Sequence, residues 1–173
     1  ESAQTLSFTI TANDNPGLFS VAPAVSPTGV LTFTTASNIN GTANLSLRIQ
    51  DNGGVANGGV DTSAVQNFII TATPVNDAPS FTKGGDQTVL EDAGPQTVNP
   101  WATAISAGPA DESGQTLTFN VTGNTNAALF SAGPAVSPTG VLSYTPAANA
   151  NGSATITLRI RDDGSSTPPN VNA

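Results

Sequence analysis

The sequence predicts an all-β protein built from two tandem antiparallel β-sandwiches, and three observations lead to this prediction. Apolar and polar residues alternate along most of the chain, turn motifs separate the alternating runs, and one long segment occurs twice. Residues 1–53 match residues 112–164 without a gap, at a constant offset of 111 residues, and most positions are identical. A repeat of this length has the size of a domain rather than of a solenoid unit. We therefore expect a section of a tandem domain array.

Strands are predicted wherever the alternation is regular, which is at 6–10, 45–49 and 68–72 and at the repeat equivalents 117–121 and 156–160. Alternation rich in β-branched and aromatic residues is typical of strands with one face on a core and the other in water. The predicted core residues are Leu6, Phe8, Ile10, Phe33, Leu47 and Ile49, with their repeat partners Leu117, Phe119, Val121, Tyr144, Leu158 and Ile160.

Turn motifs fall between these runs at short intervals. They are Asn15-Pro16-Gly17, Ser26-Pro27-Thr28-Gly29, Asn40-Gly41 and Asp51-Asn52-Gly53-Gly54. No stretch carries a capped helical stripe, and only residues 102–110 could hold a helical turn. Short strands joined by frequent turns indicate a sandwich of roughly 100 residues and seven strands when complete.

The phase of the repeat predicts that both domains are incomplete. Residues 54–111 occur only once, so the first repeat, 1–75, is expected to lack its N-terminal strands. The second repeat, 81–173, is expected to lack its C-terminal strand. Residues 76–80 lie between them in a short connector that contains Pro79 and follows Pro74, which favours an extended chain.

Composition excludes several classes of function. The net charge is −8, with four basic and twelve acidic residues, which argues against binding to nucleic acid or to an anionic membrane surface. The chain has no Cys and no His, so disulfides, thiolate catalysis and Cys-ligated zinc are excluded. No stretch approaches the roughly 20 apolar residues of a membrane span. An acidic, Cys-free chain rich in Thr, Asn and Gly is associated with secreted bacterial surface proteins, so we expect an extracellular location.

Four motifs carry a family resemblance. They are the linker Pro74-Val75-Asn76-Asp77-Ala78-Pro79, Val89-Leu90-Glu91-Asp92, the run from Ala110 to Phe119, and Arg161-Asp162-Asp163-Gly164. Together they resemble the cadherin-like and immunoglobulin-like tandem repeats of large bacterial extracellular proteins, including RTX-type adhesins. The resemblance implies Greek-key immunoglobulin-like sandwiches on the cell surface, often stiffened by calcium. It does not identify a ligand.

The resemblance also implies a Ca²⁺ site at the linker. The matching positions are Asn76, Asp77, Asp111, Glu112, Asp162 and Asp163. Sites at the neighbouring linkers would use Asp51 with Asn52, and Glu91. Oxygen-rich loops of this kind suit Ca²⁺, which tolerates irregular geometry. The alternative is that these residues form metal-free Asx turns, where Asp, Asn and Gly are favoured anyway.

Other candidate sites are better explained by structure. Tyr144 replaces Phe33 in a core-facing phase, so we interpret it as core rather than as a sugar platform. Lys83, the sole lysine, lies beside Gly84 and Gly85 in a predicted loop, which argues against an isopeptide bond to Asn. Adjacent carboxylates in turns point apart and are unsuited to glycosidase chemistry. We therefore predict that the chain is not an enzyme.

The leading interpretation is a structural repeat: a spacer, stalk or fibre-forming section of a long secreted bacterial protein. The alternative is an adhesive module that recognises a glycan or a surface protein through its loops. The identical Ser-Pro-Thr-Gly hairpins favour the spacer, whereas residues 53–59 differ from residues 164–169, as binding loops would. The expected partners are neighbouring repeats. They either continue covalently or assemble head to tail into a filament, each completing the next by strand complementation.

Overall fold

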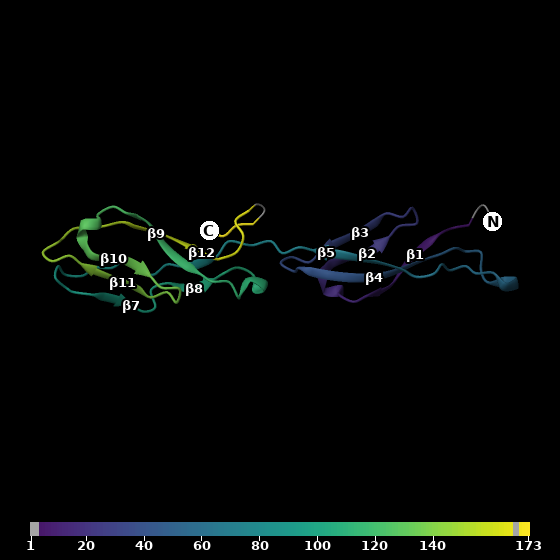
Figure 1. Ribbon diagram of the computed structural model, residues 1–173, viewed down its shortest axis with the longest axis horizontal. Helices are drawn as coiled ribbons and strands as arrows, with labels where there is room; N and C mark the ends of the chain where they lie inside the picture. The colour runs from purple at the N-terminus through teal and green to yellow at the C-terminus, as the bar shows by residue number, and fades with distance from the viewer. Residues whose placement is uncertain (1–3, 168–169) are drawn as a thin grey trace. The chain divides into compact units, whose positions relative to one another are not determined.

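The computed structural model describes residues 4–167 and 170–173, and nearly all of its regular structure is β-strand (Figure 1). The chain divides into two compact units, Glu1–Pro74 and Val75–Ala173, which we call unit 1 and unit 2. The helices of the described residues are single 3-10 turns, and none has the length or hydropathy needed to span a membrane. The prediction of an all-β fold is confirmed.

Unit 1 is built from five strands and two 3-10 turns among its described residues. These are β1 (Ser7–Asn13), η1 (Pro16–Leu18), β2 (Phe19–Val25), β3 (Leu31–Thr35), β4 (Gly41–Gln50), η2 (Ala56–Gly58) and β5 (Gln66–Ala72). The first sheet has the order β1-β4-β5 and the second pairs β2 with β3, and all pairings are antiparallel. This is the alternating, turn-linked arrangement that the sequence predicts.

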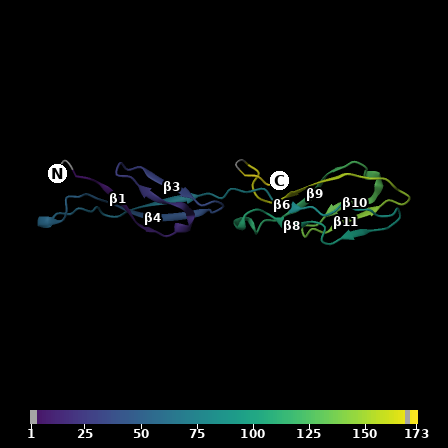
Figure 2. The same cartoon turned by 180° about the vertical axis from the view of Figure 1, so that it is seen from behind.

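Unit 2 has seven strands among its described residues. These are β6 (Ser80–Thr82), β7 (Gln96–Val98), β8 (Thr103–Ser106), η3 (Ala110–Glu112), β9 (Thr118–Asn124), η4 (Ala127–Leu129), β10 (Phe130–Val136), β11 (Leu142–Pro146) and β12 (Ile156–Arg161). The sheet orders are β10-β11-β7, β12-β9 and β6-β8. Seen from behind in Figure 2, β10 and β11 again lie side by side. A helical turn was considered for residues 102–110, but residues 103–106 form strand β8, and the 3-10 turn η3 begins only at Ala110.

The repeated strands pair in the same register in both units. Phe8 lies opposite Ile49 in unit 1, and the equivalent Phe119 lies opposite Ile160 in unit 2. Even the irregularity is repeated, because both pairs skip one residue at the same place, after Ile10 and at its equivalent. The hairpins β2–β3 and β10–β11 also share their register and their two shifts. Sequence identity between the copies therefore extends to backbone geometry.

The observed cores only partly match the predicted ones. Tyr144 and Ile160 are buried as predicted, and Tyr144 packs edge-on against Phe130. Leu6, Phe33 and Val121 are 40% or more exposed, so placing them in the core was wrong. For Phe33 the reason is visible in unit 2, where Tyr144 packs in one cluster with Ala102, and where residues of β6 to β8 pack on that cluster. Unit 1 has no equivalent of these strands among its described residues.

The unit boundary lies between Pro74 and Val75. Asn76 and Asp77 make hydrogen bonds within unit 2, and Ser80 is the first residue of β6. The connector assigned to 76–80 from the sequence is thus, in the structure, the N-terminal segment of unit 2.

Candidate functional site

One end of unit 2 is organised around the side chain of Asn76. Its Nδ2 donates to the main-chain oxygens of Val171 (2.5 Å) and Asp77 (3.1 Å), and to Asp162 Oδ1 (3.3 Å). Its Oδ1 accepts a hydrogen bond from Gln115 Nε2 at 2.6 Å. We call Asn76, Glu112, Gln115 and Asp162 the Asn76 cluster.

Main-chain hydrogen bonds fix the same segment in place. The Asn76 amide donates to Asn170 Oδ1 (2.7 Å), and the Asn76 carbonyl accepts from the Val171 amide (2.9 Å). The Asp77 amide donates to Glu112 Oε1 at 2.7 Å. Three segments far apart in the chain therefore meet here: the residues before β6, the turn η3 before β9, and the residues after β12.

The cluster buries two carboxylates and leaves part of their hydrogen-bonding capacity unused. Glu112 and Asp162 are 5% and 6% exposed, and Asn76 is 8% exposed. Within the described part of the chain, Glu112 Oε2, Asp162 Oδ2 and Gln115 Oε1 are buried without a hydrogen-bond partner. No ion pair to Glu112 or Asp162 is formed there, since the one ion pair of that part joins Lys83 to Asp86. Buried oxygens without a hydrogen-bond partner are costly, so these three atoms are the feature of the cluster that requires an explanation.

Two glycines allow the chain to close around the cluster. A Cβ added to Gly164 would overlap Asn76 Oδ1, and one added to Gly108 would overlap Glu112 Oε2. Gly108 also has a φ of +155°, which other residues rarely adopt. The close packing of Asn76 against the turn after β12 therefore depends on glycine.

The remaining predicted linker residues lie outside this buried cluster. Asp77 takes part through its main chain, and its side chain is exposed, as are those of Asp111 and Asp163. Asp163 Oδ1 accepts from the Thr116 amide at 2.9 Å, and this hydrogen bond lowers the pKa of the Asp163 carboxyl. Across residues 4–167 and 170–173, no group of three or more acidic side chains converges as a metal site.

Gln115 is the member of the cluster that the sequence prediction missed. It lies in the repeated motif Glu-Ser-x-Gln-Thr, so its recurrence as Gln4 was visible in the sequence. An amide side chain is a weaker indication of metal binding than a carboxylate is, so the motif alone does not mark Gln115 as a site residue.

The corresponding end of unit 1 carries the same turn. Gly53 N donates to Asp51 Oδ1 (2.8 Å) and Thr5 N donates to Asn52 Oδ1 (2.9 Å). The equivalent bonds in unit 2 are Gly164 N to Asp162 Oδ1 (2.9 Å) and Thr116 N to Asp163 Oδ1. The structure therefore places Asp51 and Asn52 in an Asx-type turn that closes the strand end.

Glu91 lies elsewhere in unit 2, exposed in the turn between β6 and β7. Its neighbour Asp92 has a φ of +62° and accepts from the Asn149 amide at 2.8 Å. This loop is held by Asp92, and the structure does not bring Glu91 into the Asn76 cluster.

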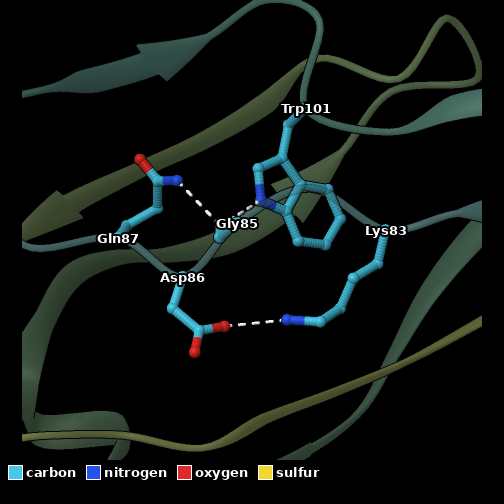
Figure 3. A network of polar contacts seen from close by, with 5 residues as sticks. All are labelled: Lys83, Gly85, Asp86, Gln87 and Trp101. Atoms are coloured by element: carbon cyan, nitrogen blue, oxygen red, sulfur yellow. Dashed lines mark hydrogen bonds and ion pairs between the residues drawn. The ribbon is translucent and has the colours of Figure 1, made fainter.

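Lys83 and Trp101 belong to a small loop network, shown in Figure 3. Lys83 Nζ contacts Asp86 Oδ1 at 2.8 Å, and the lysine side chain is 62% exposed. Trp101 Nε1 and Gln87 Nε2 both donate to the Gly85 carbonyl. An isopeptide bond needs a buried lysine, and Lys83 is exposed. The network therefore serves to stabilise the loop, and Trp101 packs on the unit 2 core.

Comparisons with known proteins assign a family. A profile described as bacterial Ig domain matches residues 76–173, which begin at Asn76 itself. A search of curated proteins and a search of solved structures each gave no match. The profile covers more than half of the chain, and the antiparallel sandwich topology agrees with it. Domains of this kind are generally structural modules rather than enzymes, and the chain belongs to the bacterial immunoglobulin-like domain family.

Proposed function

We propose that the chain is a structural repeat section, serving as spacer, stalk or fibre-forming segment, of a long secreted bacterial surface protein. The observation that carries this proposal is the residue-for-residue agreement of strand register between the two units. Selection for a ligand would favour divergent loops, whereas a spacer needs each unit to reproduce the same geometry.

The detailed geometry of the two hairpin turns also supports a structural role. In both units the serine Oγ of Ser-Pro-Thr-Gly contacts the threonine Oγ1, at 2.9 Å from Ser26 to Thr28 and 2.8 Å from Ser137 to Thr139. The glycines Gly29 and Gly140 both have a φ of +85°. Loops that recur with this fidelity are suited to architecture rather than to recognition.

The proposal is tested with chains that carry two, three and four copies of the repeat period. Small-angle scattering should give a largest dimension that rises linearly with copy number, as for a rod-like array. A dimension that levels off, with the particle becoming compact, would contradict a spacer.

An adhesive module is the second candidate, favoured by one loop. Residues 53–59 differ from their repeat equivalents, and the loop carries exposed Val55 (66% exposed), with Val60 (81% exposed) directly after it. The test is binding of the whole chain to a glycan array and to host-cell surface proteins. Binding lost on Val55→Ser and Val60→Ser replacement would assign this loop to recognition.

We further propose that Ca²⁺ stiffens the repeat by binding at the Asn76 cluster. Support comes from the buried, unpartnered oxygens of Glu112, Asp162 and Gln115, which are the hard donors that Ca²⁺ takes. Bound there, the ion would neutralise two buried carboxylates. Ca²⁺ takes roughly six to eight oxygens, so main-chain carbonyls and water would complete the shell.

Calorimetry of the whole chain in Ca²⁺ and in chelator tests this proposal. Free Ca²⁺ at about one hundred times its Kd should add about 2.7 kcal/mol, which corresponds to roughly 10–20 °C in the melting temperature of unit 2. Glu112→Gln with Asp162→Asn should remove the Ca²⁺-dependent rise. Asp86→Asn, an exposed carboxylate in the Lys83 loop, is the matched control. Equal melting temperatures in Ca²⁺ and in chelator would contradict the proposal.

A further inference from the structure

Each unit has an outward-facing polar strip on two paired strands. Strand β9 pairs with β12 in unit 2 as β1 pairs with β4 in unit 1, and Figure 1 shows β9 and β12 side by side. Because Phe119 and Leu158 pack on the core, the residues that alternate with them project from the opposite face of the sheet. We call this strip the β9–β12 face. Its exposed residues are Thr116, Thr118, Asn120, Arg159, Arg161 and Asp163.

Strand register brings the two arginines of the face next to uncharged polar side chains. Thr118 lies opposite Arg161, and Asn120 lies opposite Arg159. Opposite residues of an antiparallel pair have their Cβ atoms about 5 Å apart on one face of the sheet. A shallow hollow of about 360 Å³ lies here, lined by Thr116, Thr118, Asn120, Arg161, Asp162 and Asp163. One guanidinium, hydroxyl groups, an amide and a carboxylate therefore border the same space.

The equivalent strip of unit 1 is electrically balanced. Its arginine, Arg48, lies near Asp61, and Asp61 Oδ2 accepts a hydrogen bond from Gln50 Nε2 at 3.1 Å. Hydrogen bonds from Thr62 and Gln50, together with the charge of Arg48, lower the pKa of the Asp61 carboxyl. The carboxylate is therefore ionised at neutral pH and offsets the charge of Arg48.

Unit 2 has different charges at the equivalent positions. By the repeat offset, Gln50, Asn52 and Asp61 of unit 1 are replaced by Arg161, Asp163 and Asn172. The arginines of the β9–β12 face thus outnumber its carboxylate by one, although the chain as a whole has a net charge of −8. Within the described residues neither Arg159 nor Arg161 forms an ion pair. Unit 2 therefore displays a local positive charge on an otherwise acidic protein.

The exposure of this face does not depend on what lies beside β12. Strand β4 is paired on both sides, with β1 and with β5, and Arg48 on β4 is exposed all the same. Side chains that project from the face of a sheet stay accessible when a neighbouring strand is added in its plane. The two units therefore differ here in side-chain chemistry, at positions whose strand register is shared.

We propose that the β9–β12 face of unit 2 binds an acidic polysaccharide, with a uronate carboxylate of the ligand on Arg161. A guanidinium presents paired N–H donors that match the two oxygens of a carboxylate. Arg159 adds a second positive charge on the same face, and Thr118 and Asn120 offer hydrogen-bonding groups for the hydroxyls of the sugar.

Asp163 favours a ligand that carries hydroxyl groups as well as a negative charge. Its Oδ1 accepts from the Thr116 amide at 2.9 Å, and Oδ2 can accept a hydrogen bond from a sugar hydroxyl. A chain of phosphates has no such donors and would place negative charge beside Asp163 and Asp162, so polyphosphate and nucleic acid fit less well. A uronic acid polymer provides both carboxylates and hydroxyls.

This inference goes beyond the proposed structural function. It also differs from the loop hypothesis, because the residues concerned lie on a sheet of unit 2 and not in the loop that carries Val55. A spacer whose repeats share one backbone can still hold a polysaccharide through residues that differ between the repeats.

Isothermal titration calorimetry of the whole chain with short oligomers of galacturonic acid tests the proposal. The same oligomers with every carboxylate methyl-esterified are the matched control, because they keep the sugar and lose the charge. Chelator is present throughout, so that Ca²⁺ binding does not contribute. We expect one acidic oligomer per chain, an affinity that falls as sodium chloride is raised, and no measurable binding of the ester.

Substitutions identify the face. Arg161→Gln introduces the residue that unit 1 has at this position and should weaken binding about tenfold or more, because a charge-assisted hydrogen bond is lost. Arg161→Lys keeps the charge without the paired donors and should give an intermediate affinity. Arg48→Gln removes the same charge from the equivalent strand of unit 1 and should leave the affinity unchanged. Trp101 fluorescence reports whether unit 2 stays folded.

A converse experiment transfers the charges of unit 2 to unit 1. A chain that carries Gln50→Arg, Asn52→Asp and Asp61→Asn together should bind two acidic oligomers instead of one. Circular dichroism confirms that the variant is folded. A stoichiometry that stays at one would contradict the charge comparison on which the proposal rests.

Other results would also overturn the proposal. Equal binding of the methyl ester or of inorganic polyphosphate would mean that the face does not select a uronate, and unchanged binding by Arg161→Gln would place the ligand elsewhere. Salt-sensitive dimers in light scattering that depend on Arg161 and form without oligomer would make the acidic surface of a second copy the occupant. The linear growth of the array is measured without oligomer, so the structural proposal stands or fails separately.

Discussion

Asn76 joins two ends of the unit 2 chain through one side chain. Asn76 Nδ2 donates to Asp162 Oδ1, which follows β12, and to the main-chain oxygen of Val171. The side-chain oxygen of Asn76, Oδ1, accepts a hydrogen bond from Gln115 Nε2. Asp162 is buried, and among the described residues Asn76 Nδ2 is the only side-chain group that donates a hydrogen bond to it. The sequence indicates the location through the linker motif, but the role of Asn76 as a donor appears only in the three-dimensional arrangement.

Replacing Asn76 by Ala should lower the free energy of unfolding of unit 2 by about 1–3 kcal/mol, because buried acceptors lose their donors. Urea unfolding followed by Trp101 fluorescence measures this change. Asn120→Ala, at an exposed position on β9, is the matched control and should change stability by less than about 0.5 kcal/mol. Equal effects of the two substitutions would contradict a central role for Asn76.

Asp163 gives a prediction about pH. The Thr116 amide lowers the pKa of the Asp163 carboxyl below its ordinary value of 3.8. A depressed folded-state pKa stabilises the fold above the unfolded-state value, and this stabilisation is lost as the pH falls through the folded-state pKa. Asp163→Asn should keep the hydrogen bond, as Asn52 does with Thr5, and should remove this part of the acid sensitivity. Urea unfolding of both proteins between about pH 5 and pH 2 should show a shallower decline for the variant. Parallel curves would contradict the prediction.

At the scale of elements, the two Ser-Pro-Thr-Gly hairpins are the same turn in different surroundings. In unit 2 the Gly140 carbonyl accepts from the amides of both Trp101 and Ala102 at 2.9 Å. In unit 1 nothing lies within 4 Å of a Cβ placed on Gly29. One hairpin is therefore docked on a neighbouring segment, and the other is free.

Comparing Gly29→Ala with Gly140→Ala separates the stability cost of the turn conformation from the contribution of hairpin docking. Both substitutions pay for a left-handed φ of +85°, about 1–2 kcal/mol. Gly140→Ala should cost a further 1–3 kcal/mol or so, because its Cβ would overlap the Ala102 carbonyl. Differential scanning calorimetry of the two variants measures the difference, and equal losses would show that docking contributes nothing.

The strands of this protein could be predicted from sequence because their signal is local. Alternation at 6–10 and 117–121 marks β1 and β9, and the constant offset predicts their shared register. The burial of individual side chains could not be predicted from local sequence in the same way. Phe33 and Tyr144 occupy equivalent positions, yet one is 40% exposed and the other 8%, because burial depends on strands that, in the described part of the chain, only unit 2 has. Gln115 was missed for a related reason, since its role depends on the fold bringing Asn76 to it.

At the scale of the whole molecule, the two cores are separate clusters. Each buried cluster, with the partly buried residues packed on it, consists of residues of one unit. Trp101 is the sole Trp and packs on the cluster of unit 2. Its fluorescence therefore reports the unfolding of unit 2, whereas circular dichroism reports strands of both units.

Leu142→Ala and Leu18→Ala test this division. Each removes a buried leucine, at 6% and 0% exposure, and should cost its own unit about 2–5 kcal/mol. Leu142→Ala should lower the urea midpoint of Trp101 fluorescence, and Leu18→Ala should leave that midpoint in place while shifting part of the circular dichroism transition. Leu31→Ala, 37% exposed, is the control that should cost much less than Leu142→Ala although the two leucines are repeat equivalents. If Leu18→Ala moved the fluorescence midpoint as far as Leu142→Ala does, the units would unfold as one body, and the stability of each repeat would depend on its neighbour.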